Sequence, residues 1–369
     1  MLLIKSKRDE LLGPLQAVSG IVEKRHTMPI LSNVLIEKAG TTLTLLATDV
    51  EIQIRTAIPT AEGEEVGVTV GARKLQDILR ALPEASEVSL LLEDKRMQVR
   101  AGKSRFNLQT LPAADYPRMA TQATGDSPVE LELTQRRLKR LLGLVQYAMA
   151  QQDIRYYLNG LLLVVEGSTI RAVATDGHRM ALATDEIGGE HPRTEVILPR
   201  KTVLEVARLL AESDDPVHLV VSGSQVTFRF GAVELVSKLI DGKFPDYERV
   251  IPKNHPTVLL LGRVLLLQSL LRAAILTNEK FRGVRLVLED GTMKILSTNA
   301  DQEEAQEEIE VEYTGAPLDV GFNVHYLLDV LNNVADEKVE CHLNDSNSSA
   351  LFTLPGNDSF KYVVMPMRI

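Results

Sequence analysis

Apolar residues recur at helical spacing in three stretches that begin near residues 6, 134 and 261 of the chain. The stretches are SKRDELLGPLQAVSG, TQRRLKRLLGLVQYA and LGRVLLLQSLLRAAI, and each has a polar or basic face opposite the apolar one. This period predicts three amphipathic helices. Ser6 and Thr134 are good N-cap residues for the first two, because their hydroxyls can accept a bond from the first helical turn.

Each of these helices is followed by apolar, β-branched runs, which alternation predicts to be strands. A tight-turn sequence, AGT, EGS or EDG, interrupts each run, and each run ends in Thr followed by Asp or Asn. The threonines are Thr48, Thr175 and Thr298, which lie 127 and 123 residues apart. Near-constant spacing of one pattern indicates an internal repeat.

The repeat continues downstream with a second helix pattern in each copy, GARKLQDILRAL, LPRKTVLEVARLL and GFNVHYLLDVLNNV, followed by two alternating strands. We therefore expect an α+β fold of three repeated domains, each with two helices and two small antiparallel sheets. The loop-like segments QATGDSP and PKNHP place the boundaries, which gives domains of residues 1–125, 126–253 and 254–369.

Composition agrees with a folded multidomain protein of 369 residues, since 44% of the residues are hydrophobic, 25% are charged and no low-complexity tract occurs. Cys341 is the single cysteine, so no internal disulfide can form and a reducing cytoplasm is expected. The charged start MLLIKSKRDELL does not resemble a signal peptide, and Arg263 and Arg272 interrupt the most apolar segment. We expect no membrane association.

The net charge of −9 argues against a uniformly basic nucleic-acid binder, but the charges are unevenly distributed. Acidic residues concentrate in NADQEEAQEEIEVEY, and basic residues concentrate in the helical stretches TQRRLKRLL and RKLQDILR. Basic helices in repeat register leave DNA contact open, while the acidic segment has the simpler explanation of protecting a strand edge from aggregation.

The stretch VATDGHRMALA has the composition of a catalytic turn, because Asp176, His178 and Arg179 lie within four residues of each other. The repeat weakens this interpretation, since Asp49 and Asn299 follow the corresponding threonines in the other copies. A turn whose side chain bonds the local backbone explains Thr-Asp without any chemistry.

His178 and Arg179 are peculiar to the middle copy, because their counterparts are Glu51 and Ile52 in the first copy and Asp301 and Gln302 in the third. The chain contains no nucleophile elbow, P-loop, HExxH motif or metal-spaced His or Cys cluster, so neither a metal nor a cofactor is expected. A hydrolase that uses Asp176 and His178 remains an alternative.

Six motifs in order, ATDGHRMA, RYYLNG, ILTNEKFRGVRL, DGKFPDYERVIPKN, TLPAADYP and YVVMPMRI, resemble the bacterial DNA polymerase III beta subunits, the replicative sliding clamps. The resemblance implies that two chains associate head to tail into a ring that encircles duplex DNA and catalyses nothing. It implies sequence-independent binding of double-stranded DNA and, as protein partners, a second copy, the replicative polymerase catalytic subunit, the clamp loader, and other DNA polymerases and repair proteins. A nucleic-acid binder that does not encircle DNA is the rival hypothesis.

The resemblance also implies three sites. DNA-contacting positions fall on Arg25, Arg73, Gln152, Tyr156 and Tyr157. A pocket for partner peptides falls on Leu158, Thr175, Gly177, His178, Arg179, Met180, Pro245, Arg249, Val250, Val363, Val364, Met365, Pro366, Met367 and Arg368. In this pocket Met adapts its shape to many ligands, and Arg179 can bond a peptide carbonyl.

The third implied site is the dimer interface. One edge is formed by Lys74, Arg96, Lys103, Arg105, Phe106 and Leu108 of one chain and the other by Ile275, Leu276, Glu303, Glu304, Glu307 and Glu308 of its partner. The contact is heterologous and closes after two subunits. Because exposed ion pairs contribute only about 0 to 1 kcal/mol each, we expect the apolar residues to dominate the affinity and the charges to steer association.

Overall fold

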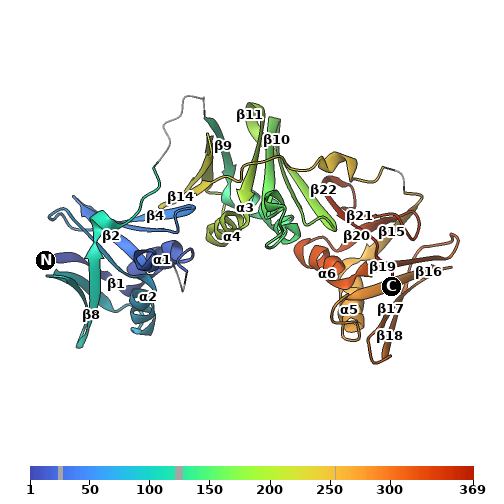
Figure 1. Ribbon diagram of the computed structural model, residues 1–369, viewed down its shortest axis with the longest axis horizontal. Coiled ribbons are helices and arrows are strands. Elements are labelled where there is room, and N and C mark those ends of the chain that lie inside the picture. The colour runs from blue at the N-terminus through green and yellow to red at the C-terminus, as the bar shows by residue number, and fades with distance from the viewer. Residues whose placement is uncertain (24–27, 121–127, 254) are drawn as a thin grey trace. The chain divides into compact units, whose positions relative to one another are not determined.

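The computed structural model describes residues 1–23, 28–120, 128–253 and 255–369 (Figure 1). The chain forms two compact units, and each is described by itself. Unit 1 contains Met1–Leu138 and Leu204–Leu239, and unit 2 contains Lys139–Val203 and Ile240–Ile369. Among the described residues, no helix has the length and hydropathy that crossing a bilayer requires.

All six expected helices are present in the described residues. They are α1 (Arg8–Ser19), α2 (Ala72–Ala81), α3 (Gln135–Gly143), α4 (Arg200–Leu209), α5 (Arg263–Ala274) and α6 (Val324–Asn333). Thr134 caps α3 as predicted, since its hydroxyl accepts a bond from the Arg137 amide at 3.3 Å. The prediction for Ser6 was wrong by one residue, because Lys7 is the N-cap of α1 and the Glu10 carboxylate accepts its amide at 3.2 Å.

Unit 1 contains one twelve-stranded antiparallel sheet, in the order β1-β6-β7-β8-β5-β2-β3-β4-β14-β13-β12-β9. The first eight strands in chain order are β1 (Leu2–Lys7), β2 (Asn33–Ala39), β3 (Thr42–Thr48), β4 (Ile52–Pro59), β5 (Val66–Gly71), β6 (Glu87–Glu93), β7 (Arg96–Ala101) and β8 (Ser104–Pro112). The remaining four are β9 (Val129–Thr134), β12 (Pro216–Ser222), β13 (Gln225–Phe230) and β14 (Val233–Lys238).

Unit 2 contains a six-stranded sheet, β10-β11-β22-β21-β20-β15, and a four-stranded sheet, β18-β17-β16-β19. The strands of the first are β10 (Gly160–Thr175), β11 (Arg179–Pro199), β15 (Thr257–Gly262), β20 (Lys338–Leu343), β21 (Ala350–Leu354) and β22 (Asn357–Val364). Those of the second are β16 (Gly283–Glu289), β17 (Thr292–Thr298), β18 (Glu304–Glu310) and β19 (Leu318–Asn323).

The threefold repeat predicted from sequence is visible in the strand pairing. In the first copy β2 pairs with β5 and β3 with β4, and in the third copy β16 pairs with β19 and β17 with β18. In the middle copy the two halves of β10 pair with the two halves of β11 in the same way, and the register shifts near Gly167. Gly40, Gly167 and Gly291, one in each predicted turn, all have positive φ, which glycine adopts without strain.

The small sheets expected for each domain join into larger ones at two strand pairs. In unit 1, β14 of the middle copy pairs antiparallel with β4 of the first copy, and Ser237 lies opposite Ile52. In unit 2, β22 of the third copy pairs antiparallel with β11 of the middle copy, and Val364 lies opposite Arg179. Neighbouring copies are therefore connected by backbone hydrogen bonds between strand edges.

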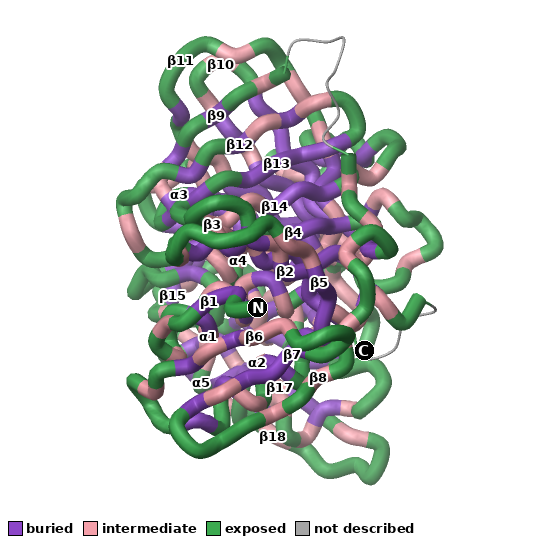
Figure 2. Tube along the Cα trace, turned by 90° about the vertical axis from the view of Figure 1, so that its left-hand side faces the viewer, coloured by how far each residue is buried: buried purple, intermediate pink, exposed green. Residues whose placement is uncertain are grey.

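Burial follows the alternation that predicted the strands. Along β12, Val217, Leu219 and Val221 are buried while the side chains between them are more exposed. Figure 2 shows the same contrast between buried strand positions and exposed hairpin ends. The core is aliphatic, with few aromatic side chains, as the composition of 4% Phe, Trp and Tyr indicates.

Candidate functional site

The turn at Thr175 and Asp176 begins the site, and it is a backbone-bonded turn as predicted. The Thr175 hydroxyl donates to the Arg179 carbonyl at 2.6 Å and accepts the Gly177 amide at 3.1 Å. The Asp176 carboxylate accepts the amides of His178 at 2.9 Å and Arg179 at 3.1 Å. The carboxylate is thus occupied in holding the turn.

The other two copies use the same turn. In the first copy the Thr48 hydroxyl donates to the Ile52 carbonyl at 2.9 Å, and Asp49 accepts the Ile52 amide at 2.8 Å. In the third copy the Asn299 amide oxygen accepts the Glu303 amide at 2.9 Å. This turn is one residue longer, so the counterpart of Arg179 is Glu303, and the assignment of Gln302 from sequence was wrong.

Arg179 points back into unit 2 instead of outward, and only 10% of its side chain is exposed. Its Nε donates to Asp176 at 3.1 Å, and its Nη2 donates to the Tyr147 carbonyl at 2.7 Å. Its Nη1 donates to Asp329 on α6 at 2.5 Å. Each guanidinium nitrogen therefore has a protein acceptor, which leaves little donor capacity for a peptide carbonyl.

An apolar floor lies beside this turn. Leu158, Met180 and Val363 belong to one buried cluster that also includes Phe244 and Tyr247. Met180 is paired with Val363 across β11 and β22, and the Met365 amide donates to the His178 carbonyl at 2.9 Å. The structure therefore brings together the turn, the start of β11 and the C-terminal strand.

The other residues predicted for this pocket lie at its rim or follow the chain end. Pro245, Arg249 and Val250 are exposed on either side of buried Tyr247, and Arg249 pairs with Asp246 at 2.8 Å. Val364 is buried, whereas Met365 is 49% exposed. Pro366 and Met367 are half-buried and Arg368 is exposed, where the chain passes β19 and the Met367 amide donates to Gly321.

The hydrolase alternative finds no support in this geometry. In the described part of the chain, no hydrogen bond joins the His178 ring to a carboxylate, and the Asp176 oxygens are bonded to amides and to Arg179. No group of three His, Cys, Asp or Glu side chains among the described residues could hold a metal ion. Burial raises the pKa of Tyr147 and Tyr362, so the hydroxyls near Arg179 remain neutral.

The DNA residues implied by the resemblance divide between the two units. In unit 2, Gln152 is exposed at φ +55, Tyr156 is 57% exposed and Tyr157 packs against the apolar cluster. A core role therefore fits Tyr157 but not Tyr156. In unit 1, Arg73 is exposed on α2, and its guanidinium donates to the Val22 carbonyl at 3.1 Å. Arg25 lies outside the described residues.

Two local arrangements accompany these residues. In the loop before Tyr156, the Arg155 side chain bonds Asp153 and lowers the pKa of that carboxyl to about 2, so this pair is charged at neutral pH. In unit 1, a cavity of about 490 Å³ between α1, α2 and α4 is lined by three guanidinium groups, those of Arg73, Arg80 and Arg208. Asp77 and Glu205 line the same cavity and Glu205 pairs with Arg208, so the three arginines leave only a small excess of positive charge there.

The predicted interface residues gather on two strand edges. Arg96, Lys103, Arg105, Phe106 and Leu108 lie on β7, β8 or the turn between them, and residues 104–109 of β8 pair only with β7. Glu304, Glu307 and Glu308 lie on β18, the last strand of its sheet. Both edges have unpaired backbone groups in the described part of the chain. Lys74 is exposed on α2, Glu303 directly precedes β18, and Ile275 and Leu276 follow α5.

The structure adds a correction to the charge pattern of this interface. Glu307 already has a partner in its own unit, because Arg272 donates to it from Nε at 2.8 Å. This bond lowers the pKa of Glu307. Glu303, Glu304 and Glu308 are the exposed carboxylates of the set.

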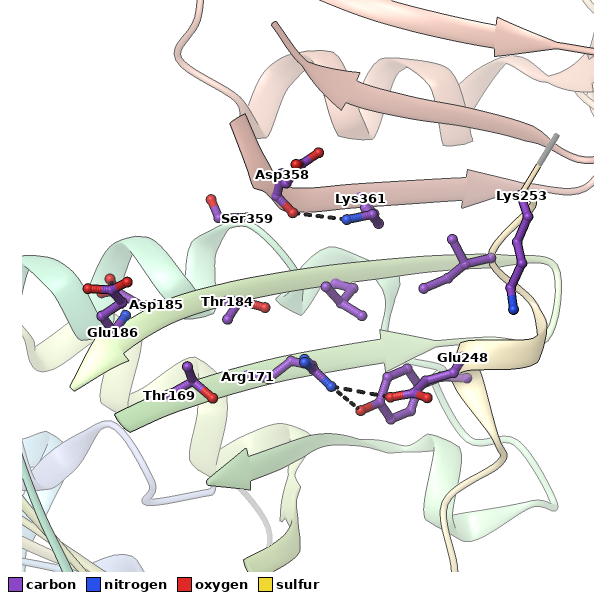
Figure 3. Close-up of a pocket in the computed structure, with 13 residues that line it drawn as sticks. Thr169, Arg171, Thr184, Asp185, Glu186, Glu248, Lys253, Asp358, Ser359 and Lys361 are labelled. Carbon is purple, nitrogen blue, oxygen red and sulfur yellow. Dashed lines mark hydrogen bonds and ion pairs between the residues drawn. The ribbon is translucent and has the colours of Figure 1, made fainter. Parts of the chain in front are cut away.

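A cavity of about 680 Å³ on the β10, β11 and β22 face was not found by sequence reasoning. Arg171 and Leu182 line it, together with Tyr247 and Glu248. Arg171 donates to the Tyr247 hydroxyl at 2.8 Å, and Figure 3 shows Arg171 directed at Glu248, with Asp185 and Glu186 at the opposite end. None of the predicted pocket residues lines this cavity, although Leu182 and Tyr247 belong to the same apolar cluster. The only signal in the sequence is the alternation that places Arg171 on the same face of β10 as Val173 and Thr175.

A repeated α+β chain with strand-to-strand joints and, in its described part, two unpaired strand edges is typical of a clamp-type scaffold protein. Three family models match in order: the DNA polymerase III beta subunit N-terminal domain at residues 2–120, the central domain at 132–246 and the C-terminal domain at 248–368. The chain belongs to the DNA polymerase III beta subunit family. Proteins of this family are non-catalytic processivity factors, which removes the hydrolase alternative.

Named relatives agree over nearly the whole chain. The beta sliding clamp of Pseudomonas aeruginosa is 47% identical over 365 residues, which cover 98% of this chain and 99% of the relative. That of Escherichia coli K12 is 47% identical over 364 residues, with the same coverage. The crystal structure of the Pseudomonas aeruginosa DNA polymerase III subunit beta has a TM-score of 0.94 and 46% identity, with complete coverage of both chains.

Proposed function

We propose that two copies of this chain form a ring that encircles duplex DNA and tethers the replicative DNA polymerase to it. In the ring, basic helices face DNA and make sequence-independent contacts with phosphates. The docking face takes segments of the polymerase catalytic subunit, the clamp loader, and other polymerases and repair proteins. Enclosure, not tight contact, keeps the protein on DNA.

The observation that carries the proposal is the pattern of strand joints. Each of the three repeats within the chain has two strands that can form such a joint. One is the strand after the Thr turn, which is β4, β11 or β18, and the other is the last strand of the repeat, which is β8, β14 or β22. β14 pairs with β4, and β22 pairs with β11. The two strands left over are β8 and β18, whose edges are unpaired in the described residues. If β8 of one subunit pairs with β18 of a second subunit, and the reverse, the same joint is repeated and a closed, heterologous dimer results.

The repeat also gives the register of this joint. Gln53 lies opposite Val236 at the β4–β14 joint. Their counterparts are Glu304, which like Gln53 pairs with the threonine of the turn, and Asn107, which occupies the place of Val236 in its hairpin. We therefore place Asn107 of one subunit opposite Glu304 of the other subunit, with Phe106 opposite Ala305.

Cysteine cross-linking tests this register. The double variant Asn107→Cys with Glu304→Cys should form an intersubunit disulfide under mild oxidation, because directly opposed residues of an antiparallel pair have Cα atoms about 4.5 to 5.5 Å apart. The matched control pairs Asn107→Cys with Glu308→Cys, four residues further along β18, and should not cross-link. Equal cross-linking of both pairs would contradict the register, and the native Cys341 is buried and should not interfere.

Retention on DNA tests encirclement. A closed ring should remain on nicked circular DNA after loading and leave it after linearisation. A nucleic-acid binder that does not encircle would be retained equally on both forms and would respond only to salt. Equal retention would therefore overturn the proposal in favour of that rival.

The docking face can be tested with a peptide ligand. Relatives from Pseudomonas aeruginosa and Bartonella birtlesii have been crystallised bound to griselimycin, and we propose that this chain binds it at the apolar floor of Leu158, Met180 and Val363. Deletion of Met365–Ile369 should weaken griselimycin binding while the dimer remains intact in sedimentation. Unchanged binding would contradict the assignment of the C-terminal residues.

We further propose the domain limits 1–125, 126–253 and 254–369, and a cytoplasmic location, where replication proteins work in bacteria. The family matches, which end at 120 and 246 and resume at 132 and 248, support boundaries near these positions. Limited proteolysis should cut first near residues 125 and 253, and cleavage inside β2 or β16 instead would contradict the limits.

A further inference from the structure

The guanidinium group of Arg179 lies in an aromatic cage that includes residues of the third copy. It lies over the Tyr326 ring on α6, with 4.5 Å from Cζ to the ring centroid, and near the Tyr147 ring at 5.7 Å. Tyr362 of β22 completes the cage, since its ring is 5.7 Å from that of Tyr147 and its hydroxyl donates to the Tyr326 carbonyl at 2.9 Å. A planar, delocalised cation suits such a cage, and lysine does not reproduce its geometry.

Asp329 is the acidic partner that α6 contributes to this cage. It accepts a bond from Arg179 Nη1, while Asp176 accepts from Nε on the opposite side of the guanidinium. The Asp329 side chain is 39% exposed, so it can be changed without opening the core. Asp329 is not among the residues that the family resemblance places in the docking pocket.

The backbone of Arg179 belongs to the docking face even though its side chain points away from it. Its neighbour His178 bonds the Met365 amide, and its neighbour Met180 lies in the apolar floor. A side chain held by α6 therefore fixes the turn from which the docking face is built. The counterpart Ile52 in the first copy has no such tie, because it is simply buried.

We propose that Asp329 is a positioning residue for partner docking, which acts through Arg179 to hold the Gly177–Met180 turn in its binding geometry. The inference rests on the proposed docking function of this face. It also makes docking reciprocal with the third copy: a ligand that prefers the ordered turn strengthens the Arg179–Asp329 contact, and loss of that contact weakens the ligand.

The test measures griselimycin affinity by calorimetry on the full-length protein, at a temperature well below unfolding. Asp329→Asn should lower the affinity about fivefold or more, a typical size for coupling between sites, although Asp329 does not touch the ligand. Asp329→Glu keeps the charge and should restore most of the affinity. Asp336→Asn is the matched control, because it removes the same charge from an exposed position just after α6, and it should leave the affinity unchanged.

The outcomes separate this inference from the function on which it rests. If the unaltered protein binds griselimycin and Asp329→Asn binds it equally well, the positioning role is wrong and the docking face stands. If the unaltered protein does not bind, the docking face itself is wrong and the inference falls with it. If Asp329→Glu fails to rescue binding, the charge-dependent contact is not what positions the turn, which also overturns the proposal.

Discussion

The first and middle copies contain the same turn but differ in the residue that follows it. In both, a threonine hydroxyl and an aspartate carboxylate close the turn on the residue that begins the next strand, Ile52 or Arg179. Both residues begin the strand that joins a neighbouring copy, β4 or β11. Ile52 is 1% exposed and apolar, whereas Arg179 is held by acidic and aromatic side chains.

This difference separates what the turn itself needs from what the proposed docking face uses. In these two copies the side-chain hydrogen bonds that close the turn come from Thr and Asp, and a backbone bond from the Asp amide accompanies them. The residue after the turn is under no such requirement. The middle copy has a charged residue at this point and the first copy an aliphatic one, although the Thr and Asp hydrogen bonds of the turn are the same.

The largest expected effect comes from giving the first copy the residue of the middle one. Ile52→Arg puts a cation beside Asp49 but in a fully buried position that an aliphatic side chain now fills, and we expect a loss of about 3 kcal/mol or more in the free energy of unfolding. Urea unfolding or calorimetry checks this. Thr41→Arg adds the same charge at an exposed turn of the same sheet and should change stability by no more than about 0.5 kcal/mol. If Ile52→Arg lowered the free energy of unfolding no more than Thr41→Arg does, the first copy would accept an arginine at this position as the middle copy does.

A smaller effect is expected from the turn carboxylates. Asp49→Ala removes an acceptor for the amides of Glu51 and Ile52, which should cost about 1 to 2 kcal/mol, and Asp176→Ala should cost more because Arg179 also loses a partner. Asp49→Asn should be nearly neutral, since Asn299 closes the third turn in this way. Equal losses for both alanine variants in thermal unfolding would contradict the additional role of Asp176.

The third position of the turn gives effects of opposite sign. Gly177 has φ +90, and a Cβ there would lie 2.9 Å from the Arg155 guanidinium, so Gly177→Ala should cost about 1 to 2 kcal/mol. Its counterpart Val50 has φ +71, which is strained for a β-branched residue. Val50→Gly should therefore be neutral or stabilise by up to about 1 kcal/mol, as measured by the unfolding temperature. A clear destabilisation would mean that Val50 is held by packing.

The smallest expected effect is on the labelling rate of Cys341, which reports whether a variant destabilises unit 2. Cys341 in β20 is buried, and burial raises the pKa of its thiol to about 12, so labelling at pH 8 should be slow until unit 2 opens. Gly177→Ala lies in unit 2 and should increase the labelling rate about fivefold, whereas Val50→Gly lies in unit 1 and should leave it unchanged. Equal rates for the two variants would show that the two units do not open separately.

Much of the fold was predictable from sequence because its signals are local. Helical periodicity located all six helices, and the recurring Thr-Asp or Thr-Asn pair revealed the repeat. The length of the third turn could not be predicted, because it differs from the other two by a single residue. Gln302 was assigned as the counterpart of Arg179, but a longer third turn, with Gln302 at φ +64, shifts that role to Glu303. Nothing in the letters Asn-Ala-Asp-Gln-Glu fixes the residue at which the chain re-enters the sheet.

Side-chain direction was the second limit. An arginine beside a predicted pocket was expected to face the ligand, yet Arg179 turns inward toward Asp329, which is 150 residues distant in sequence. Long-range partners of this kind leave no periodic signal. The cavity lined by Arg171 escaped for the same reason, since its walls come from β10, β11, β22 and the segment near Tyr247.

The joint between β4 and β14 has a consequence for how this protein can diverge. Nearly any residue except proline can make the main-chain hydrogen bonds of this joint, so substitutions are costly only where the side chain is also buried, as at Ile52, Ile54 and Leu235. An insertion or deletion of one residue is different, because a shift by one position turns every side chain of the strand to the opposite face. Related proteins should therefore differ most at the exposed positions of this joint, such as Arg55, while keeping its length constant.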